Sequence, residues 1–473
     1  MRLIVHPGAP LEGSVRPPGD KSITHRAYVL GLVGEGLTVV ESPNPGADCG
    51  ATLACAARLG AACDSFAAGT EARVEIRGRA GDLIEPDRVL ECGNSGTTLR
   101  LMAGVLAAQP FLAVLSGDES LNRRPVARVI EPLRRMGATL TARDGDRLPP
   151  LVVRGGRLNG IRYDLPVASA QVASCVLLAA LKAEGETEVT LPGPARDHTE
   201  RMLRAFGVKV ESTARNGSGP RLRLAGPARP RATRLRVPGD FSAAAFFLAA
   251  AAATPGGSVT ALGVGLNPTR TALLDALEQM GARVEVRALP EAGEEPVGDI
   301  TVTGPERLRG IELPAEWVPR MIDEIPAWAI AAATAAGRSR LSGAAELRVK
   351  ESDRLALLAA NLGALGIVVR ERPDGLEIEG ATVAGGAVRT GGDHRIAMAF
   401  AVLGTRAAGP IAIDDASSIA TSYPGFADAL TALGGRMEPA ATSAREPASG
   451  GRRATGPASA ATSGPATGRG RAS

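Results

Sequence analysis

Six segments of the chain share one hydrophobic pattern, in which an amphipathic helical stretch ends at a glycine and a short alternating strand follows. The six junctions are Leu59-Gly60, Met136-Gly137, Phe206-Gly207, Met280-Gly281, Leu365-Gly366 and Leu433-Gly434. They lie 68 to 85 residues apart, which is longer than the period of solenoid repeats. A glycine directly after the last apolar helical position is typical of a helix that ends in the left-handed conformation. The pattern predicts a sixfold repeat of small α/β subdomains.

The six repeats fall into two groups of three, because a polar turn near the start of the chain recurs about midway. Arg16-Pro17-Pro18-Gly19-Asp20 recurs 220 residues later as Arg236-Val237-Pro238-Gly239-Asp240. A chain of 473 residues also exceeds the size of one ordinary hydrophobic core. We therefore predict an α/β fold of two similar domains, residues 16–232 and 233–438, each with three repeated α/β subdomains. The first strand, within residues 1–15, precedes the first turn, and we expect it to pack with the second domain.

Charge and composition set the last part of the chain apart. The formal net charge of +4 equals that of residues 439–473 alone, which carry five Arg and one Glu. This tail is rich in Ala, Gly and Ser and almost free of large apolar residues, so we expect it to be disordered. The remaining chain is neutral overall, so no nucleic-acid partner and no membrane association are expected. We expect a monomer.

The cysteines and the missing motifs indicate a cytoplasmic protein without metal or cofactor. Cys49, Cys55, Cys63, Cys92 and Cys175 are odd in number, form no Cys-x-x-Cys pair and lie among small residues, as buried free thiols do. No signal segment or membrane-spanning apolar run is found. No residue cluster has the spacing of metal ligands, and no glycine loop has a nucleotide-binding pattern.

Residues that can carry chemistry gather where helices are predicted to begin. Asp20 is a good helix cap, and the apolar run that follows places Lys21, Ser22 and Arg26 in or near the first turn. An ammonium, a hydroxyl and a guanidinium at the positive end of a helix dipole suit a phosphate or carboxylate. A solvated helix start with two surface cations fits this stretch equally well.

Three further polar segments are candidates for ligand contacts. Cys92-Gly93-Asn94-Ser95-Gly96-Thr97 has two glycines that allow close approach of a ligand to the backbone. The polar loop 116–125 closes on Arg124-Pro125, and Arg suits bidentate binding of carboxylate or phosphate. In the charged segment 348–354, a helix would put Lys350 and Arg354 on one face. A salt-bridged surface helix is the commoner origin of such a cluster.

If the helix starts of both domains face each other, these residues converge on a cationic cleft between the domains. The converging cations are Lys21, Arg26, Arg124, Arg196, Lys350, Arg354 and Arg395, and the carboxylates among them are Asp323 and Glu351. Such a cleft suits substrates with several negative charges, and it leaves the carboxylates and Lys21 for proton transfer.

Seven motifs in this order resemble the enolpyruvyl transferase family, over roughly residues 3–438, and most closely its branch that acts on shikimate 3-phosphate. The motifs are Pro-Gly-Asp-Lys-Ser…Arg, Gly-Asn-Ser-Gly-Thr-Thr, Arg-Pro, Ser-Ala-Gln, Asp-Glu-Ile-Pro, Arg-Val-Lys-Glu-Ser-Asp-Arg and Asp-His-Arg-Ile-Ala-Met. The resemblance implies a fold of the inside-out barrel type, with the active site in the cleft between two domains. It also implies transfer of the enolpyruvyl group of phosphoenolpyruvate to the 5-hydroxyl of shikimate 3-phosphate, with release of phosphate, as a step towards chorismate and the aromatic amino acids.

The resemblance further implies a role for each residue of the cleft. Asp323 takes the proton of the hydroxyl, Glu351 is the candidate for proton transfer at C3 of phosphoenolpyruvate, and Lys21 lies between the substrates. The residues implied for shikimate 3-phosphate are Lys21, Ser22, Arg26, Ser169, Gln171, Arg196, Asp323 and Lys350. The residues implied for phosphoenolpyruvate are Lys21, Gly96, Arg124, Gln171, Arg354 and Arg395, with His394 nearby.

The main alternative is the sister branch that acts on UDP-N-acetylglucosamine. Its members typically carry a reactive Cys in the loop that is residues 117–125 here, and Asn after the first Lys. This chain has no Cys in that loop and has Ser22 after Lys21. An inactive scaffold or an RNA-end-processing relative would lose the cations of the cleft, which this chain keeps, so a nucleic-acid role rests on the tail alone.

Four positions depart from the pattern of many family members. Ala170 and Ala195 replace serines, Thr421 replaces a Lys, and Leu101 replaces a Pro. These changes resemble the second of the family's sequence classes.

Gly96 predicts sensitivity to glyphosate, because tolerant members of that class carry Ala at this position. We expect phosphate release to fall as glyphosate is raised at a fixed concentration of phosphoenolpyruvate. Normal turnover at an inhibitor concentration far above that of phosphoenolpyruvate would contradict the prediction.

Overall fold

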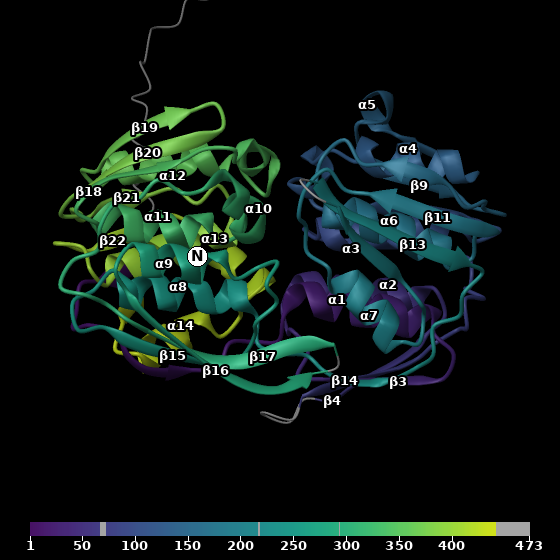
Figure 1. Cartoon of the computed structure of the whole chain (residues 1–473), viewed down its shortest axis with the longest axis horizontal. Helices are drawn as coiled ribbons and strands as arrows, with labels where there is room; N and C mark the ends of the chain where they lie inside the picture. Colours follow the sequence, from purple (N-terminus) through teal and green to yellow (C-terminus); the bar gives the residue numbers. More distant parts are fainter. Residues whose placement is uncertain (67–71, 216–217, 293, 441–473) are drawn as a thin grey trace, which may run out of the picture. The chain divides into compact units, whose positions relative to one another are not determined.

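A recurring unit of two helices and a small sheet occurs six times within residues 1–66, 72–215, 218–292 and 294–440, the part of the chain that the computed structural model describes (Figure 1). The second helix of each unit ends at one of the six predicted glycines. Their φ angles are +98° at Gly60, +117° at Gly137, +79° at Gly207, +106° at Gly281, +84° at Gly366 and +96° at Gly434. The predicted sixfold repeat is therefore confirmed. From residue 441 onward, the predicted disordered tail lies outside the described residues.

In the first half of the chain, each sheet joins one parallel pair of strands to an antiparallel hairpin. The strands are β3 (Leu37–Glu41), β4 (Ala62–Phe66), β5 (Arg73–Arg77), β6 (Leu90–Glu91), β7 (Leu112–Ser116), β8 (Thr139–Ala142), β9 (Leu148–Arg154), β10 (Arg162–Asp164), β11 (Gly185–Thr190), β12 (Glu211–Arg215), β13 (Ser218–Gly226) and β14 (Arg234–Arg236). Their orders are β14-β3-β5-β4, β6-β7-β9-β8 and β10-β11-β13-β12. The first two strands in each order are parallel.

The second half repeats this plan. Its strands are β1 (Leu3–His6), β2 (Glu12–Val15), β15 (Ser258–Gly265), β16 (Arg283–Ala292), β17 (Glu295–Thr303), β18 (Gly337–Leu341), β19 (Val368–Arg372), β20 (Gly375–Gly380), β21 (Gly386–Val388), β22 (Ile411–Ile413) and β23 (Arg436–Pro439). The orders are β16-β17-β15-β2, β18-β20-β19 and β21-β22-β1-β23. In the three-stranded sheet, single parallel bridges from Arg309 to Ala336 and from Glu312 to Arg340 take the place of a fourth strand.

Two strands at the start of the chain pair with the second half, although the first half follows them directly in sequence. β1 pairs with β22 and β23, and β2 pairs in parallel with β15. β14 follows the predicted boundary at residues 232 and 233 but still pairs with β3; the boundary itself stays a prediction. The chain therefore passes between the halves twice, once after β2 and once after β14.

The two crossing segments are bonded to each other. Gly19 and Gly239 form an antiparallel bridge. The N–H of Asp20 donates to the carbonyl oxygen of Pro238, and the N–H of Asp240 donates to that of Pro18, each at 2.8 Å. The duplicated Pro-Gly-Asp turns thus meet where the chain crosses.

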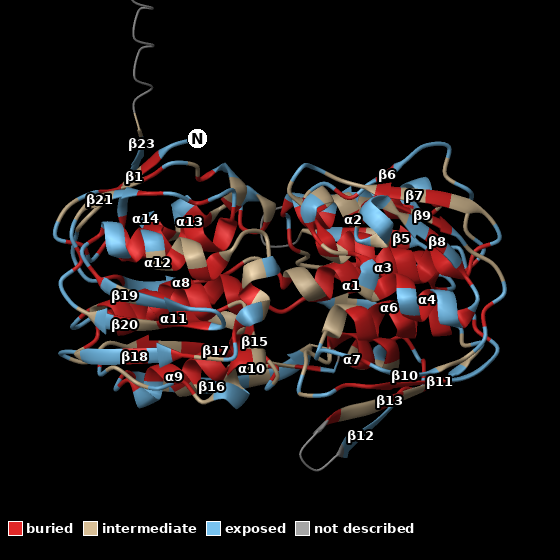
Figure 2. Cartoon of the chain, turned by 90° about the horizontal axis from the view of Figure 1, so that it is seen from above, coloured by how far each residue is buried: buried red, intermediate tan, exposed pale blue. Residues whose placement is uncertain are grey.

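The first helix of each unit is buried on nearly all sides. These helices are α1 (Lys21–Val33), α3 (Gly96–Ala107), α6 (Ala170–Ala180), α8 (Phe241–Ala252), α11 (Ile325–Thr334) and α13 (His394–Gly404). All 12 residues of α8 are buried. Because a helix that is apolar all round is stable only inside a protein, these helices lie inside and the sheets outside (Figure 2). The predicted α/β fold of two similar halves, with helices inside, is confirmed.

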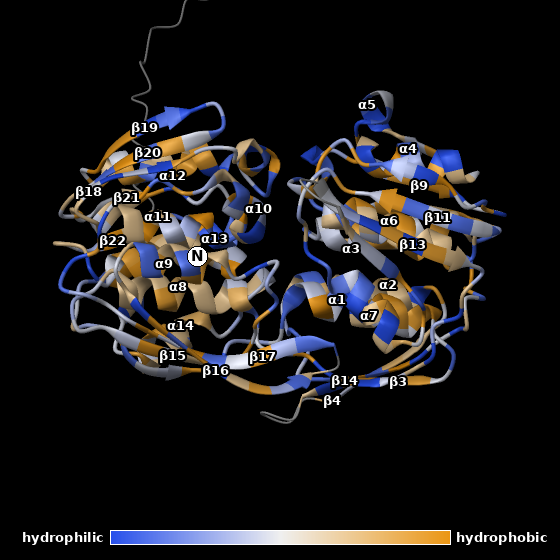
Figure 3. Cartoon of the chain, in the orientation of Figure 1, coloured by the Kyte–Doolittle hydropathy of each residue, from blue (hydrophilic) through white to orange (hydrophobic). Residues whose placement is uncertain are grey.

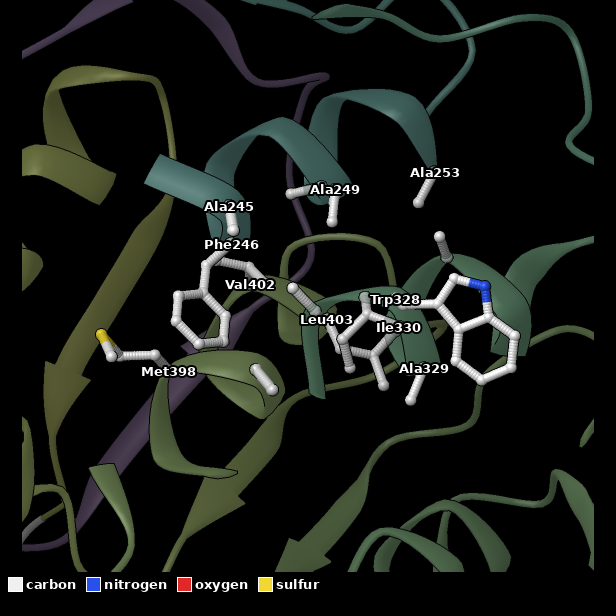
Figure 4. Packing of buried hydrophobic residues seen from close by; sticks show 14 of the residues in the cluster. Ala245, Phe246, Ala249, Ala253, Trp328, Ala329, Ile330, Met398, Val402 and Leu403 are labelled. Carbon is white, nitrogen blue, oxygen red and sulfur yellow. The ribbon is translucent and has the colours of Figure 1, made fainter. Parts of the chain in front are cut away.

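Small residues let the central helices of the second half approach closely. Ala245, Ala249 and Ala253 recur every four residues and so share one side of α8 and its last turn. Figure 4 shows them directed towards larger side chains, which include Trp328 of α11 and Leu403 of α13. Buried residues form one such core in each half.

The second helices of the units have one apolar side and one polar side, visible as mixed colours in Figure 3. They are α2 (Ala47–Arg58), α4 (Ala127–Met136), α7 (His198–Ala205), α9 (Ala272–Gln279), α12 (Arg354–Ala364) and α14 (Phe426–Ala432). The shorter elements are α5 (Arg143–Asp146), α10 (Val318–Met321) and the 3-10 turns η2 (Leu121–Arg123), η3 (Ala315–Trp317), η4 (Ala345–Val349) and η5 (Ser417–Thr421). Within the described ranges, no helix has both the length and the apolar character to cross a membrane.

Residues 348–354 do not form one continuous helix, so Lys350 and Arg354 do not share a helix face. The turn η4 ends at Val349, and α12 begins only at Arg354. The carboxylate of Asp353 accepts the N–H of Ala356 at 3.0 Å and caps α12. An Asp in this position stops a helix from continuing through it. Lys350 and Glu351 therefore lie in the bend between the two elements.

Gly363, inside α12, and Gly366, just beyond its end, should respond oppositely to alanine. Gly363 lies inside the helix, and an added Cβ would meet nothing within 4 Å, so Gly363→Ala should stabilise the protein by roughly 0.5–1 kcal/mol. Gly366 has φ of +84°, so Gly366→Ala should destabilise it by about 1–2 kcal/mol. The midpoint of urea unfolding measures both, and equal shifts for the two variants would contradict the assigned cap.

Candidate active site

Polar residues at the helix starts of both halves line one cavity. The first half supplies residues from the starts of α1, α2, α3 and α6 and from the segments ahead of α4 and α7. The second half supplies residues from the segments ahead of α11 and α12 and from the start of α13. The predicted site residues found there are Lys21, Ser22, Arg26, Gly96, Arg124, Ser169, Gln171, Arg196, Asp323, Lys350, Glu351 and Arg395. The expected convergence is thus observed, and several helix dipoles add to the positive field.

Asp323 lies among four cations. Its Oδ2 is 2.7 Å from Nη2 of Arg196 and 4.0 Å from Nη2 of Arg395. Its Oδ1 is 3.2 Å from Nη1 of Arg354 and 4.0 Å from Nζ of Lys350. Burial opposes ionisation, but these cations outweigh it and hold the pKa of Asp323 well below its usual range. Asp323 is therefore ionised at neutral pH.

Glu351 is a second carboxylate that lies among cations. Its Oε2 is 2.6 Å from Nη2 of Arg354, and its Oε1 is 3.7 Å from Nη1 of Arg124. Burial again opposes ionisation, but Arg354, Arg124, His394 and Lys21 hold the pKa of Glu351 well below its usual range. The same guanidinium, that of Arg354, therefore contacts both carboxylates.

Arg354 is less accessible than a residue that contacts a ligand is expected to be. Its side chain is completely buried and does not line the cavity. Besides Asp323 and Glu351, it contacts Asp393, whose Oδ2 is 2.8 Å from Nε of Arg354. Contact of Arg354 with phosphoenolpyruvate stays a prediction, and in this arrangement Arg354 fixes the positions of the carboxylates.

Lys21 is held by two carboxylates, and one of them was missed in the sequence. Its Nζ donates to Oδ2 of Asp48 at 3.2 Å, and its backbone N–H donates to Oδ2 of Asp240 at 3.0 Å. Asp48 lines the cavity from the first turn of α2. Its position after Pro45-Gly46 and before an apolar run could have marked it as one more polar helix start.

Arg26 uses most of its donors inside the protein. It donates to Oγ1 of Thr199 at 2.6 Å, to the carbonyl oxygen of Ser22 at 2.9 Å and to Oγ of Ser174 at 3.0 Å. Burial lowers its pKa to about 10, so it stays charged at neutral pH. Arg26 therefore joins α1, α6 and α7 as well as lining the cavity.

Gln171 is fixed in one orientation by Arg100, a residue of the Gly96 motif that was not predicted as a site residue. Arg100 Nη1 donates to Oε1 of Gln171 at 2.7 Å, and Gln171 Nε2 donates to Oγ1 of Thr97 at 2.9 Å. Arg100 Nη2 also donates to the carbonyl oxygen of Pro125 at 3.1 Å. A Cβ at Gly96 would lie 2.7 Å from Nη1 of Arg100, so a larger residue there would push this guanidinium aside.

The histidines take different places. His394 is buried near the cavity, and burial together with Lys21 and Arg395 holds its pKa well below the usual range, so it is neutral. His198 is buried, and its Nδ1 is 2.7 Å from Oε1 of Glu295. Within the described residues, no group of three or more His, Cys, Asp and Glu side chains could hold a metal ion.

The predicted thiols are all free in the described structure. Cys49, Cys55, Cys92 and Cys175 are buried, and Cys63 is partly buried. Burial raises the pKa of Cys175 to about 12 and that of Cys63 to about 11. Such thiols are weak nucleophiles at neutral pH.

Comparisons with known proteins agree on one family. The family model described as EPSP synthase (3-phosphoshikimate 1-carboxyvinyltransferase) matches residues 5–430. A 3-phosphoshikimate 1-carboxyvinyltransferase of Acidithiobacillus ferrooxidans is 51% identical over 425 residues, which are 90% of this chain and 96% of the relative. One of Desulforudis audaxviator is 49% identical over 439 residues, 92% of this chain and 99% of the relative.

Solved structures give the same result. An EPSP synthase from Acinetobacter baumannii aligns with a TM-score of 0.81 and 44% identity, over 92% of this chain and 99% of its own. The enolpyruvyl transferase NikO from Streptomyces tendae aligns with a TM-score of 0.74 over 92% of this chain and 98% of its own. At 19% identity, this second likeness concerns the fold alone.

The lowered pKa of Asp323 predicts how its contribution to stability depends on pH. A carboxylate whose pKa is lower in the folded than in the unfolded state stabilises the fold above its unfolded pKa, near 4, and this contribution is lost as pH falls through the folded pKa. Asp323→Asn should therefore lower the free energy of unfolding by about 3 kcal/mol at pH 7, because it leaves buried cations unpaired. The difference between the variant and the unaltered protein should become smaller below about pH 4.

Urea unfolding between pH 7 and pH 3 measures this difference. Asp64→Asn is the control, because Asp64 is an exposed Asp on β4 outside the cavity. A cost of Asp323→Asn that is the same at every pH would contradict the assigned field.

Proposed function

The chain belongs to the EPSP synthase (3-phosphoshikimate 1-carboxyvinyltransferase) family, and from this premise we propose that it transfers the enolpyruvyl group of phosphoenolpyruvate to the 5-hydroxyl of shikimate 3-phosphate, with release of phosphate. One observation carries the proposal for this chain. Two ionised carboxylates, Asp323 and Glu351, lie in a cavity whose other charged groups are mostly cations. Both substrates are anions, so the cations bind them while the carboxylates remain for proton transfer.

The cations of the cavity divide between the two substrates. Arg196 and Lys350 stand beside Asp323. They receive shikimate 3-phosphate together with three other residues that line the cavity, Ser22, Arg26 and Ser169. Arg124 stands beside Glu351, and with Arg395, Gln171 and the Gly96 turn it receives phosphoenolpyruvate. Lys21, which lines the same cavity, is assigned to both substrates.

In the addition step, the 5-hydroxyl loses its proton to Asp323 as its oxygen bonds to C2 of phosphoenolpyruvate. C3 gains a proton and becomes a methyl group. In the elimination step, the bond from C2 to the phosphate oxygen breaks, C3 loses a proton, and phosphate leaves with the bonding electrons. Asp323 and Glu351 stand at separate points of the cavity, bridged by Arg354, which suits proton transfer at two different atoms.

Substrate binding changes the pKa of Glu351 in the direction that the reaction needs. In the free protein, Arg354 and Arg124 keep this group ionised despite burial. The phosphate and carboxylate of phosphoenolpyruvate bring negative charge to Arg124 and Lys21 and so offset part of their field. The pKa of Glu351 then rises, and the group can carry a proton to C3 and take it back.

Ion pairs between the halves support a chain that closes over its substrates. Arg196 of the first half contacts Asp323 of the second, and Arg124 contacts Glu351. We propose that residues 16–232 and 233–438 move as domains, and that the chain acts as a monomer in the cytoplasm, which its five free thiols favour.

Phosphate release from phosphoenolpyruvate, with metal chelated, tests the proposed reaction. We expect release with shikimate 3-phosphate and none with UDP-N-acetylglucosamine, the acceptor of the sister branch. Asp323→Asn and Glu351→Gln should each lower kcat by about 10²–10⁴-fold, because each removes a proton-transfer group. Asp64→Asn should leave kcat unchanged. Release with UDP-N-acetylglucosamine alone, or equal rates in all variants, would refute the proposal.

A further inference from the structure

Arg270 connects the two chain crossings through one buried guanidinium. It precedes α9, and 2% of its surface is exposed. Its Nη1 donates to Oδ2 of Asp20, and its Nη2 donates to Oδ1 of Asp240 at 3.3 Å. Asp20 and Asp240 occupy equivalent places in the duplicated turns. A single side chain of the second half therefore holds the caps of both α1 and α8.

One branch of this network leads to Lys21. Asp240 accepts the backbone N–H of Lys21 through its other oxygen, Oδ2, at 3.0 Å. Asp20 accepts the N–H of Ile23 at 2.9 Å and so caps α1. Both contacts fix the first turn of α1, and Arg270 fixes both carboxylates that make them.

A second branch leads to Asp323. Arg270 Nη2 donates to Oγ of Ser242 at 2.7 Å, and that hydroxyl donates to Oε1 of Glu324. Glu324 is completely buried, follows Asp323 directly and precedes α11. Glu324 Oε1 also lies 4.0 Å from Nη2 of Arg196, which pairs with Asp323. The same guanidinium is therefore linked, through Ser242, to the side chain of the residue next to Asp323.

From these contacts we propose that Arg270 is a positioning residue, which sets the placement of Lys21 relative to Asp323; the inference rests on the reaction proposed above. The two groups come from different halves, and the two branches from Arg270 reach both of them. Arginine suits this role because its planar fork holds two carboxylates at fixed angles, whereas a lysine ammonium has no such geometry.

Arg270→Lys tests the proposal, since it keeps the charge and removes the fork. We expect kcat to fall by at least about tenfold, because small errors in the placement of reacting groups cost that much. KM for each substrate should change by less than about threefold, since the cations that bind the substrates remain. Ser242→Ala cuts only the branch to Glu324 and should lower kcat by less.

Leu273→Ala is the matched control. Leu273 lies on α9, three residues from Arg270, and is completely buried in the apolar core. Its truncation should lower Tm, as the loss of Arg270 does, and should leave kcat unchanged well below the unfolding transition. Arg270→Ala adds a rescue experiment, in which methylguanidinium should raise kcat and methylammonium should not.

The outcomes separate the two proposals. If the unaltered protein releases no phosphate with either acceptor, the proposed function is refuted and the inference with it. If the unaltered protein is active, and Arg270→Lys and Ser242→Ala keep its kcat while Tm falls, Arg270 is only structural and the inference alone is refuted. Where Arg270→Lys does not fold, Ser242→Ala decides, because it removes one hydroxyl and leaves Arg270 paired with Asp20 and Asp240.

Discussion

The arrangement of the two halves depends on one buried guanidinium between two carboxylates. Arg270, Asp20 and Asp240 are each almost fully buried, and charges can be buried only when they are paired and hydrogen-bonded. Loss of one partner from such a group costs about 3–5 kcal/mol. Since Asp20 and Asp240 cap helices of different cores, the geometry of this triad fixes the start of one helix in each half.

The site between the halves is balanced by its own carboxylates until substrates bind. Arg196 and Lys350 stand beside Asp323, Arg124 beside Glu351, and Lys21 beside Asp48. In the proposed reaction, anionic substrates offer these cations a second set of partners and so free the carboxylates for proton transfer. The residues proposed to bind the substrates would then also adjust the pKa of the proposed catalytic groups.

Local patterns in the sequence predict much of this protein, and contacts between distant segments account for what they miss. The six glycines and the polar helix starts are local signals, so the repeat and the convergence of Lys21 and Asp323 could be predicted. The burial of Arg354 could not, because it depends on a helix that begins only after Asp353 and on Asp393, 39 residues further along. Arg270 gave no local signal, since its partners lie 250 and 30 residues away.

The strand exchange at the start of the chain has a consequence for synthesis on the ribosome. The first core draws on residues 23–237 alone and can form once they have emerged. β2 pairs with β15, and β1 pairs with β22 and β23. The residues that pair with Leu3 follow it by more than 400 residues. β2 therefore stays without its partner until β15 has been synthesised, and the sheet that contains β1 closes only after β23 has emerged.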